Sequence, residues 1–435
     1  FTHITGGIQT MPAETQISEK YLNQHSRPSD LKITDMRVVH LKGIPMRVPL
    51  IRIDTNQGIC GYGEVRDGAS STYALMLKSR ILGENPCNVD KVFRKIKQFG
   101  FHARQAGGVC GIEMALMDLA GKAYGVPAYM LAGGKFRDKV LVYSDTPSEP
   151  DGKAMGKRLK ARMDQGFKFL KMDLGIYFLR NVPDTVIGFP DTLRSFTVMH
   201  PFTGIQLTDK GIDYLCKYVD DVRSVIGYEV PLAVDHIGHI GLESCIRLGK
   251  ALDQFTLAWL EDLLPWQFTD QYVTLSRAVT TPICTGEDIY LKEGFMPLFE
   301  KRAVSIIHPD LASSGGILET KKIGDAAQEH GIAMAMHMAG SPIAALASVH
   351  CAAATENFLV LENHSVDEPK WNELVTGLPN PLIQDGYIAV PETPGLGFED
   401  LNEAMIREHI DPDHPGYFEP TDVWDTERSH DRLWS

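Results

Sequence analysis

The chain lacks several features that would quickly assign it to a class. No uninterrupted apolar run of about 18 residues occurs among its 435 residues, so a membrane-spanning segment is not expected. None of the seven cysteines forms a C-x-x-C pair, which removes support for a zinc ribbon or a thioredoxin-like site. No glycine-rich dinucleotide fingerprint opens a helix, because the cluster Gly58–Gly63 stands between two strand-like runs and indicates a hairpin.

Positive charge is also in short supply. The 43 lysines and arginines are outnumbered by 56 acidic residues, which gives a net charge of −13 with both signs interspersed. A nucleic-acid binder needs a basic face, so we expect neither nucleic acid nor a membrane as a partner. The odd number of scattered cysteines indicates buried free thiols and favours a cytoplasmic location. Because the chain starts at Phe1, an export signal removed earlier would leave no trace in it.

The pattern of polar and apolar residues changes twice along the chain. Residues 1–30 are polar and aperiodic and indicate an N-terminal arm. Strand-like runs at Val38–Leu41 and Leu50–Asp54, followed by an apolar helical stripe in Gly111–Tyr124, predict a small α+β domain. From about Val140 onward, short apolar strands alternate with helix-length segments.

Repeated strand-then-helix units imply parallel strands joined by crossovers. Seven or eight of them suit a closed barrel, although an open doubly wound sheet fits the same pattern. Residues 175–208 interrupt the repeat with an irregular stretch, which is typical of a lid, a subunit contact or a plain surface loop. The clearest predicted strands are Phe169–Met172, Leu232–Val234, Thr256–Leu260, Pro282–Cys284, Ser305–Ile307, Ala333–Met336 and Phe358–Leu361.

Three successive strands end in carboxylates, Asp235, Glu261 and Glu287, at equal intervals of 26 residues. One βα unit needs about that length, so all three are expected at the C-terminal barrel face, where barrel active sites lie. Converging carboxylates repel one another unless a hard cation neutralises them, and oxygen ligands suit Mg²⁺. A single acid after a strand is more often a helix cap or a solvated residue, and we interpret Asp262 and Asp288 in that way.

The next two strands end in Asp310 and His337, 27 residues apart. An aspartate beside a histidine fixes the imidazole tautomer and raises its basicity, as a general base requires. A lone histidine between two methionines would otherwise be a satisfied core residue. The pairing with Asp310 favours the base.

Lys171 and Asp173 stand two residues apart on one strand, so both side chains point to the same side. Lys171 could hold a substrate carboxylate beside the cation, or the two could form a structural Lys–Asp pair. Glu362, at the end of the last strand, could hydrogen-bond a developing enolate or close a salt bridge.

Taken together, these residues resemble the enolase superfamily and its mandelate racemase subgroup over about residues 30–410. The resemblance implies a modified TIM (β/α)-barrel at residues 141–384 and an α+β capping domain at residues 31–140, to which residues 385–435 return before the tail. It further implies that Asp235, Glu261 and Glu287 hold Mg²⁺, that Asp310–His337 is the acid/base dyad, and that Glu362 assists at the enolate oxygen. The runs that carry the resemblance are Gly111–Lys122, Leu131–Gly134, Asp385–Tyr387 and Pro394–Gly397.

The chain departs from the subgroup on its second barrel strand. Racemases and several dehydratases carry Lys-x-Lys there, whereas this chain has Asp173 in place of the second lysine, so simple two-base racemisation is disfavoured. His236 directly follows the first predicted ligand. It is a candidate acid for a leaving hydroxyl; the alternative is a histidine that only contacts the ligands or lies in the loop. Some sugar-acid dehydratases of the group carry the acid histidine two positions after the ligand, where this chain has Ile237.

The resemblance implies a hydro-lyase that dehydrates a sugar acid to a 2-keto-3-deoxy acid. Epimerisation, racemisation or cycloisomerisation through the same enediolate is the alternative, and a non-catalytic barrel that acts as a sensor or assembly protein is a remote one. The expected partners are a small acid sugar and further copies of the chain, in a homo-oligomer between a dimer and an octamer. Specificity is expected from loops around Lys42–Pro49 and Arg66–Ser71.

Overall fold

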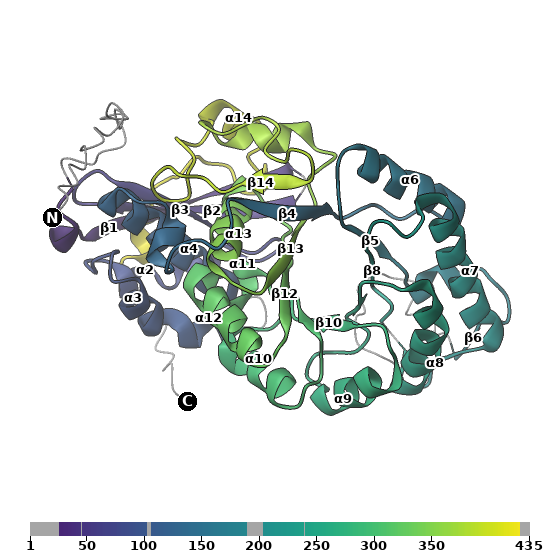
Figure 1. Cartoon of the computed structure of the whole chain (residues 1–435). Helices are drawn as coiled ribbons and strands as arrows, with labels where there is room; N and C mark the ends of the chain where they lie inside the picture. Colours follow the sequence, from purple (N-terminus) through teal and green to yellow (C-terminus); the bar gives the residue numbers. More distant parts are fainter. Residues whose placement is uncertain (1–25, 45, 102–105, 189–202, 239, 427–435) are drawn as a thin grey trace, which may run out of the picture.

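The computed structural model describes residues 26–44, 46–101, 106–188, 203–238 and 240–426. Most of the predicted N-terminal arm, and residues 189–202 of the predicted irregular stretch, lie outside these ranges. Figure 1 shows two adjoining parts, a smaller one built mainly from the purple N-terminal segment and a larger ring of strands and helices.

The smaller part contains a three-stranded antiparallel sheet in the order β1-β2-β3. The predicted hairpin is confirmed, because β2 and β3 pair in antiparallel register with Ile51 opposite Gly63. Helix α4 (Ala106–Tyr124) lies against this sheet so closely that a Cβ atom on Gly63 would stand 1.9 Å from the Gly111 carbonyl oxygen. The remaining elements are β1 (Ile33–Ile44), β2 (Met46–Thr55), β3 (Cys60–Glu64), α1 (Thr72–Leu75), α2 (Lys78–Ile81), α3 (Val89–Ile96) and α5 (Ala128–Leu131).

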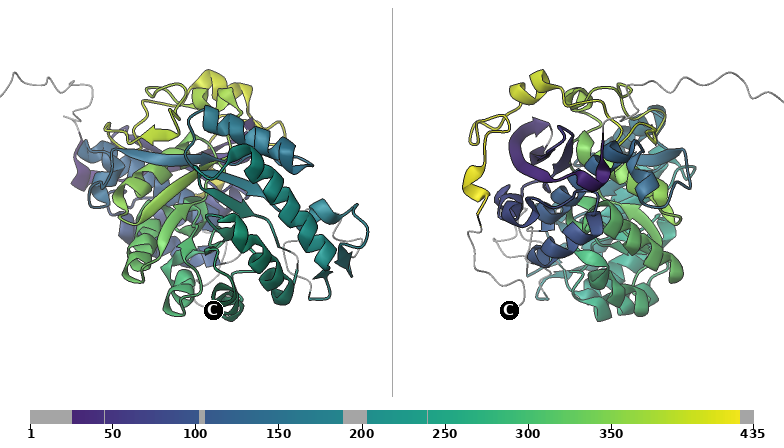
Figure 2. Two further views of the ribbon diagram at one scale, coloured as in Figure 1. Left: turned by 45° about the vertical axis from the view of Figure 1, so that its right-hand side comes forward. Right: turned by 90° about the vertical axis from the view of Figure 1, so that its left-hand side faces the viewer.

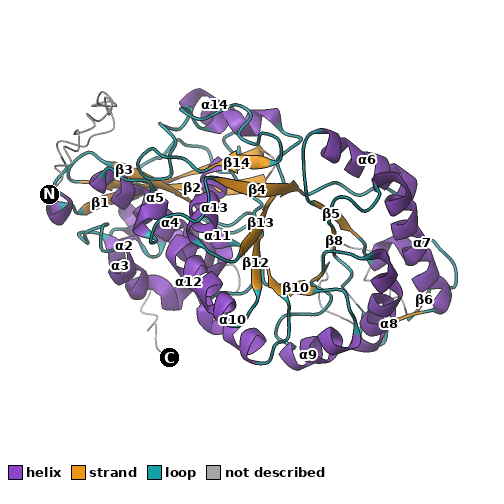
Figure 3. Cartoon of the chain, viewed as in Figure 1, coloured by secondary structure: helices purple, strands orange, loops and turns teal. Residues whose placement is uncertain are grey.

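The larger part is a curled, mostly parallel nine-stranded sheet in the order β14-β4-β13-β12-β11-β10-β9-β8-β5. The sheet curls until β4 and β5 contact each other, and Figure 3 shows the strands as an inner ring. The predicted modified barrel with a capping domain is therefore confirmed, and the open doubly wound sheet is wrong. The strands are β4 (Lys139–Ser144), β5 (Leu170–Asp173), β8 (Leu232–Asp235), β9 (Leu260–Glu261), β10 (Ile283–Thr285), β11 (Ile306–Ile307), β12 (Ala333–Met336), β13 (Phe358–Asn363) and β14 (Tyr387–Ala389).

The helices between these strands pack around the outside of the ring (Figure 3). Between β5 and α7, the stretch predicted to be irregular forms a small hairpin of β6 (Val186–Ile187) and β7 (Gln206–Leu207). The outer helices are α6 (Gly152–Asp164), α7 (Asp209–Ile226), α8 (Leu242–Leu252), α9 (Thr269–Ala278), α10 (Leu291–Glu300), α11 (Leu311–Ser314), α12 (Gly316–Glu329) and α13 (Pro342–Ala354).

The barrel interior is filled by one layer of buried side chains, and the strands or the residues just before them contribute one each. Because side chains alternate along a strand, the residue two positions further on points to the same interior. That next position carries a polar or charged side chain on most of the strands, so the hydrophobic layer forms a floor beneath a polar ring. The floor consists of Tyr143, Phe169, Ala233, Trp259, Cys284, Ile306, Ala335 and Val360.

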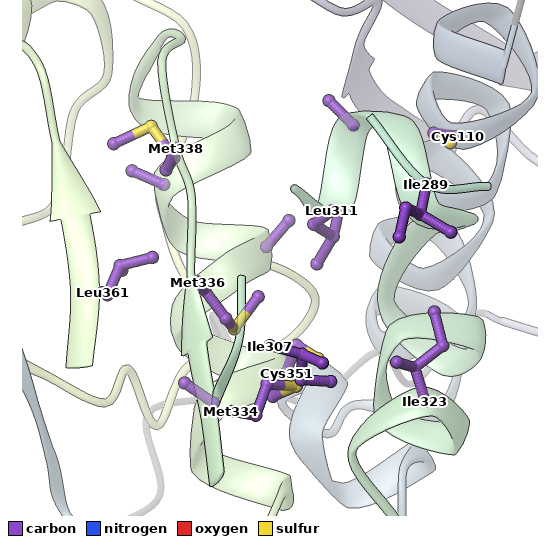
Figure 4. Close-up of a cluster of buried hydrophobic side chains, with 14 of the residues drawn as sticks. Cys110, Ile289, Ile307, Leu311, Ile323, Met334, Met336, Met338, Cys351 and Leu361 are labelled. Carbon is purple, nitrogen blue, oxygen red and sulfur yellow. The ribbon is translucent and has the colours of Figure 1, made fainter. Parts of the chain in front are cut away.

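A second hydrophobic cluster lies between the strands and the outer helices. Figure 4 shows Met334, Met336 and Met338 together with Cys351 of α13 and Ile323 of α12. Met336 and Met338 are buried, with 0% and 2% of their surfaces exposed. They flank His337, so the alternation of side chains sends both methionines into this cluster and the imidazole to the other side.

One predicted strand differs from the structure. Thr256–Leu260 was expected to be extended, but Thr256 has a left-handed φ of 46° and the strand is confined to Leu260–Glu261. A 3₁₀ turn at Asp253–Phe255 precedes it, and the left-handed residue ends that turn before the chain enters the barrel.

The C-terminal segment runs back along the N-terminal strands. It adds β14 antiparallel to β4, and it later bridges Ile410 to Leu41 of β1. The views in Figure 2 show this yellow segment passing beside the purple sheet. Helix α14 (Glu403–Glu408) lies within it. The three predicted boundaries between the four segments of the chain remain predictions.

The two parts are joined by buried carboxylates of the N-terminal part that accept hydrogen bonds from helix N-termini of the barrel. Glu113 on α4 accepts from the N–H groups of Ile317 (2.6 Å) and Leu318 (3.0 Å) at the start of α12. Glu64 on β3 accepts from the N–H of Ser341, which precedes α13. The first N–H groups of a helix have no acceptor inside that helix. The two carboxylates of the N-terminal part supply these missing acceptors for α12 and α13.

Two general expectations from composition can also be compared with the structure. All seven cysteines are free thiols, four of them buried. Within the ranges that the structure describes, every helix is too short or too polar to pass through a bilayer.

We predict that replacing Glu113 with alanine lowers the free energy of unfolding by about 1–3 kcal/mol, because two buried N–H groups would lose their acceptor. Urea denaturation followed by circular dichroism measures the change. Glu84→Ala serves as the control, because it removes only ion pairs with the exposed Lys91 and Lys95 and should cost less than about 1 kcal/mol. An equal loss in both variants would contradict the capping role.

A buried histidine makes the stability depend on pH. Burial lowers the pKa of His350 on α13 to about 4, below its ordinary value of 6.5. As the pH falls from 6.5 to 4, the unfolded chain takes up a proton that the folded chain refuses, so stability is lost over that window, by roughly 3 kcal/mol at most. His350→Gln should flatten this loss when urea midpoints at pH 7 and pH 4.5 are compared. Parallel curves would contradict it.

Candidate active site

The polar ring lies directly above the hydrophobic floor, at the C-terminal ends of the barrel strands. Each member stands two residues after a floor residue on its own strand, so the pleat turns it inward. A cavity of about 210 Å³ opens above the ring and is lined by most of the predicted site residues. The ring consists of Asp145, Lys171, Asp235, Glu261, His308, His337 and Glu362.

Lys171 lies at the centre of the ring and is 2% exposed. Its Nζ stands 2.9 Å from Asp235 Oδ2, 3.3 Å from Glu261 Oε1 and 2.8 Å from Glu362 Oε1. Burial by itself would lower the pKa of Lys171, but these three carboxylates raise it well above its ordinary value. Lys171 is therefore a fixed cation, and its partners are not the Asp173 of the alternative Lys–Asp pair.

Two of the predicted cation ligands lie together. Carboxylate oxygens of Asp235, Glu261 and Asp262 are all within 4.8 Å of one another. Glu261 is fully buried, and it also accepts from the indole N–H of Trp259 at 2.7 Å and lies 2.7 Å from His308 Nδ1. This cluster offers only oxygen donors, the set that a hard divalent cation prefers.

The interpretation of Asp262 as a helix cap or a solvated residue is wrong. Asp262 has a left-handed φ of 47°, which directs its side chain toward the acidic cluster, and its Oδ1 accepts from Thr285 Oγ1 at 2.6 Å. Burial and the neighbouring carboxylates raise its pKa well above the ordinary value. Asp288 is a solvated residue as expected, since 59% of its side chain is exposed.

Glu287, the third predicted ligand, is near enough to raise the pKa of Asp262, but it is not one of the three residues whose oxygens lie within 4.8 Å of one another. It follows Gly286, the residue that occupies the ring position on its strand, so it lies one residue past the ring. Its Oε2 stands 3.2 Å from His337 Nε2, and its Oε1 stands 3.6 Å from Arg66 NH2. Glu287 therefore faces the imidazole, and its role as a cation ligand remains a prediction.

The predicted dyad is brought together by strand register. Asp310 and His337 form a parallel β-bridge, and His337 Nδ1 lies 2.6 Å from Asp310 Oδ2. In the neutral imidazole, donation from Nδ1–H to Asp310 leaves the Nε2 lone pair directed into the cavity. Burial would lower the pKa of His337, but the carboxylates of Glu287, Glu362 and Asp310 outweigh it and raise the pKa to about 10.

His236 and Asp173 lie together at the opposite side of the cavity. His236 Nε2 is 3.9 Å from both Asp173 Oδ1 and Asp235 Oδ2, and the side chain is 46% exposed. Asp235, despite the opposing effect of burial, raises the pKa of His236 to about 9. Asp173 also accepts from Ser148 Oγ at 3.0 Å, and burial raises its pKa. His236 is thus a cation that is accessible from the cavity.

Sequence reasoning missed a second Asp–His pair. His364 Nδ1 stands 3.3 Å from Asp145 Oδ2, and its Nε2 stands 3.4 Å from Glu362 Oε1. Its ring lies 5.5 Å from that of His337. The signal was available, because Asp145 is two residues past a floor residue and His364 is two past Glu362. Glu362 therefore forms a salt bridge, which is one of the two roles that the sequence predicts for it.

Arg66 was also missed as an individual site residue. It comes from the N-terminal part, directly after β3, yet its guanidinium lies at the barrel mouth with 3% of its side chain exposed. The loop Arg66–Ser71 was expected to contribute to specificity, but no spacing in the sequence indicates that one of its residues is buried against the dyad.

The residues present fit a divalent cation. Carboxylates outnumber fixed cations at this end of the barrel, and burial together with three neighbouring carboxylates raises the pKa of Asp262. A divalent cation among Asp235, Glu261 and Asp262 would relieve that repulsion in the way Lys171 now does in part.

The comparisons with known proteins agree with this geometry. The family models "Enolase C-terminal domain-like" and "Mandelate racemase / muconate lactonizing enzyme, N-terminal domain" match residues 154–404 and 39–133. D-xylonate dehydratase of Haloferax volcanii is 34% identical over 391 residues, 88% of this chain and 89% of that protein. D-galactonate dehydratase of Ralstonia pickettii is 28% identical over 392 residues, 87% of this chain and 94% of that protein.

A solved structure points the same way. The mandelate racemase/muconate lactonizing enzyme-like protein from Rubrobacter xylanophilus covers 89% of this chain and 99% of its own, with a TM-score of 0.78 and 29% identity. A capped (β/α)-barrel with acids and an Asp–His pair at its C-terminal end defines an enzyme scaffold of the enolase kind. The chain belongs to the mandelate racemase/muconate lactonizing enzyme family of that superfamily, as the resemblance predicted.

We predict that Mg²⁺ or Mn²⁺, at about 100 times its dissociation constant, stabilises the metal-free protein by about 2.7 kcal/mol, which is a few degrees in melting temperature. Asp235→Asn should abolish this shift. Asp270→Asn changes a carboxylate that is 86% exposed and should leave the shift intact. A shift that survives in Asp235→Asn would place the cation elsewhere.

Proposed function

We propose that this protein is a Mg²⁺-dependent sugar-acid dehydratase that removes the proton α to a carboxylate and eliminates water to give a 2-keto-3-deoxy acid. The observation that carries the proposal is the Asp310–His337 pair, which faces a fixed cation and an acidic cluster across one cavity. The names of the relatives, D-xylonate dehydratase and D-galactonate dehydratase, support a monocarboxylic sugar acid as the substrate class.

The cation would be held by Asp235 and Glu261 with either Glu287, the predicted third ligand, or Asp262, which the geometry adds. When bound, Mg²⁺ stabilises the second negative charge that builds up on the substrate carboxylate as the α-proton leaves, an effect of several kcal/mol. The chain's own residues supply the remaining steps.

His337 is the base. In the neutral imidazole, Nδ1–H donates to Asp310, so Nε2 takes the α-proton and the C–H electron pair becomes part of the enediolate. A cation bound among the neighbouring carboxylates would lower the raised pKa of His337 toward that neutral form. Lys171 supplies a permanent positive charge beside the developing oxyanion. Glu362 fixes the position of that charge, because it is paired with Lys171 and His364. Burial would raise the pKa of Glu362, but Lys171, His337 and His364 hold it well below its ordinary value, so Glu362 acts as a carboxylate.

The β-hydroxyl leaves as water after it accepts a proton, and the resulting enol then ketonises. His236 is the candidate acid, because it is exposed to the cavity and Asp235 raises its pKa. Its strand β8 lies diametrically opposite β12, which carries His337, with three strands between them on either side of the ring. Proton removal and hydroxyl departure would therefore occur on opposite faces of the substrate. His337 itself, once protonated, is the alternative acid.

The assembly and location of the enzyme belong to the same proposal. We propose a cytoplasmic homo-oligomer, because the relatives are metabolic enzymes by name and all seven cysteines are free. Specificity is assigned to residues Lys42–Pro49, which the structure places at the adjoining ends of β1 and β2, and to the loop Arg66–Ser71, since Met46 and Asp67 line the cavity.

We predict that His337→Asn lowers kcat for a sugar acid at least 10²- to 10⁴-fold with Mg²⁺ present, because the proton acceptor is lost. Formation of 2-keto acid from a panel of aldonates measures it, and calorimetric Mg²⁺ titration should show retained binding. His330→Asn, at the exposed end of α12, is the control. Full activity of His337→Asn would remove it as the base.

Incubation in deuterated water distinguishes dehydration from isomerisation. A dehydratase yields a product that has lost water and gained deuterium at the former β-carbon. An epimerase or racemase returns an isomer that keeps the mass of the water and carries deuterium at the α-carbon. The second result would replace the proposed reaction by the alternative.

A further inference from the structure

Arg66 connects the N-terminal part to the two barrel strands that carry the dyad and Glu287. It follows β3, whose Glu64 already caps the helix after His337. The chain makes room for it, because a Cβ atom on Gly107 of α4 would stand 2.8 Å from Arg66 Cβ and 2.9 Å from its backbone nitrogen. The arginine is thus inserted between α4 and the barrel mouth.

The guanidinium contacts three residues of the barrel at once. NH1 lies 3.0 Å from Asp310 Oδ2, donates to Ser313 Oγ at 2.5 Å and donates to the Glu287 carbonyl oxygen at 3.1 Å. NH2 lies 3.6 Å from the Glu287 carboxylate. This planar fork satisfies several acceptors in fixed directions, which a lysine ammonium at the same place cannot do.

Asp310 is consequently held from three directions. Its Oδ2 lies between the guanidinium and His337 Nδ1, and its Oδ1 accepts from Ala312 N at 2.6 Å. Without Arg66, Asp310 would be held by Ala312 N at Oδ1 and by the imidazole at Oδ2 alone, so the contact that resists movement of Oδ2 toward the barrel mouth would be lost. The imidazole would then lose the fixed orientation that a proton transfer requires.

We propose that Arg66 is a positioning residue for the dyad, by which the N-terminal part sets the orientation of His337 through Asp310. The inference builds on the proposed function, since it assigns Arg66 to the same chemistry. It gives the N-terminal part a share in proton transfer beyond the selection of substrates. Arg66 acts through Asp310, so it is not itself a catalytic residue.

The test compares Arg66→Met and Arg66→Lys with Arg162→Met. Arg162 is a similarly buried arginine, 5% exposed, that pairs with Asp367, and neither residue is among those that line the cavity. Arg66→Met should lower kcat about 10²-fold and leave KM within about threefold, because orientation and not substrate binding is lost. Arg66→Lys should fall roughly tenfold, because the charge is kept without the fork. Arg162→Met should leave kcat unchanged.

A second readout does not need turnover. The Nδ1–H proton of His337 that bridges to Asp310 should give a far-downfield proton resonance in the wild type, which shifts or broadens in Arg66→Met and persists in Arg162→Met. Circular dichroism verifies that each variant is folded. If Arg66→Met does not fold, the comparison is made with Arg66→Lys. An unchanged kcat together with an unchanged resonance in the Arg66 variants overturns the proposal. A wild type without turnover of any sugar acid, in which the resonance still responds to Arg66, overturns the proposed function alone.

Discussion

The arrangement of the site depends on the compensation of negative charge at the C-terminal end of the barrel. A ring of carboxylates above a hydrophobic floor is unfavourable in a low-dielectric interior, because each acid loses its hydration and repels the next. Lys171 offsets part of that cost by contacting Asp235, Glu261 and Glu362 simultaneously. The excess that remains creates the demand for a divalent cation, and it raises the pKa values of His337 and His236.

The same constraint explains why the N-terminal part is more than a lid. Its buried groups Glu64, Arg66 and Glu113 all end at the strands and helices around Asp310 and His337. Glu113 caps α12, the second helix after Asp310, and Glu64 caps α13, the helix after His337. The strand ends that carry the dyad are therefore supported from above by the other part of the chain, which limits how far either can move.

Much of this could be predicted from the sequence, and the reason is periodicity. Equal spacing of Asp235, Glu261 and Glu287 follows from the length of a βα unit, and the two-residue alternation of a strand decides which neighbours share a face. Asp262 was misjudged because the turn after β9 has a left-handed residue that reverses its direction, and spacing carries no information about that dihedral angle. Arg66 was missed because its contact joins positions more than two hundred residues apart.

His337 illustrates how little separates a core residue from a base. Its neighbours Met336 and Met338 are packed among the side chains of α12 and α13, and the pleat alone turns the imidazole between them toward the cavity. A register shift of one residue on β12 would bury the imidazole and expose a methionine to the carboxylates. The bridge between Asp310 and His337 fixes the register against that shift, so the contact that orients the imidazole also keeps the strand in place.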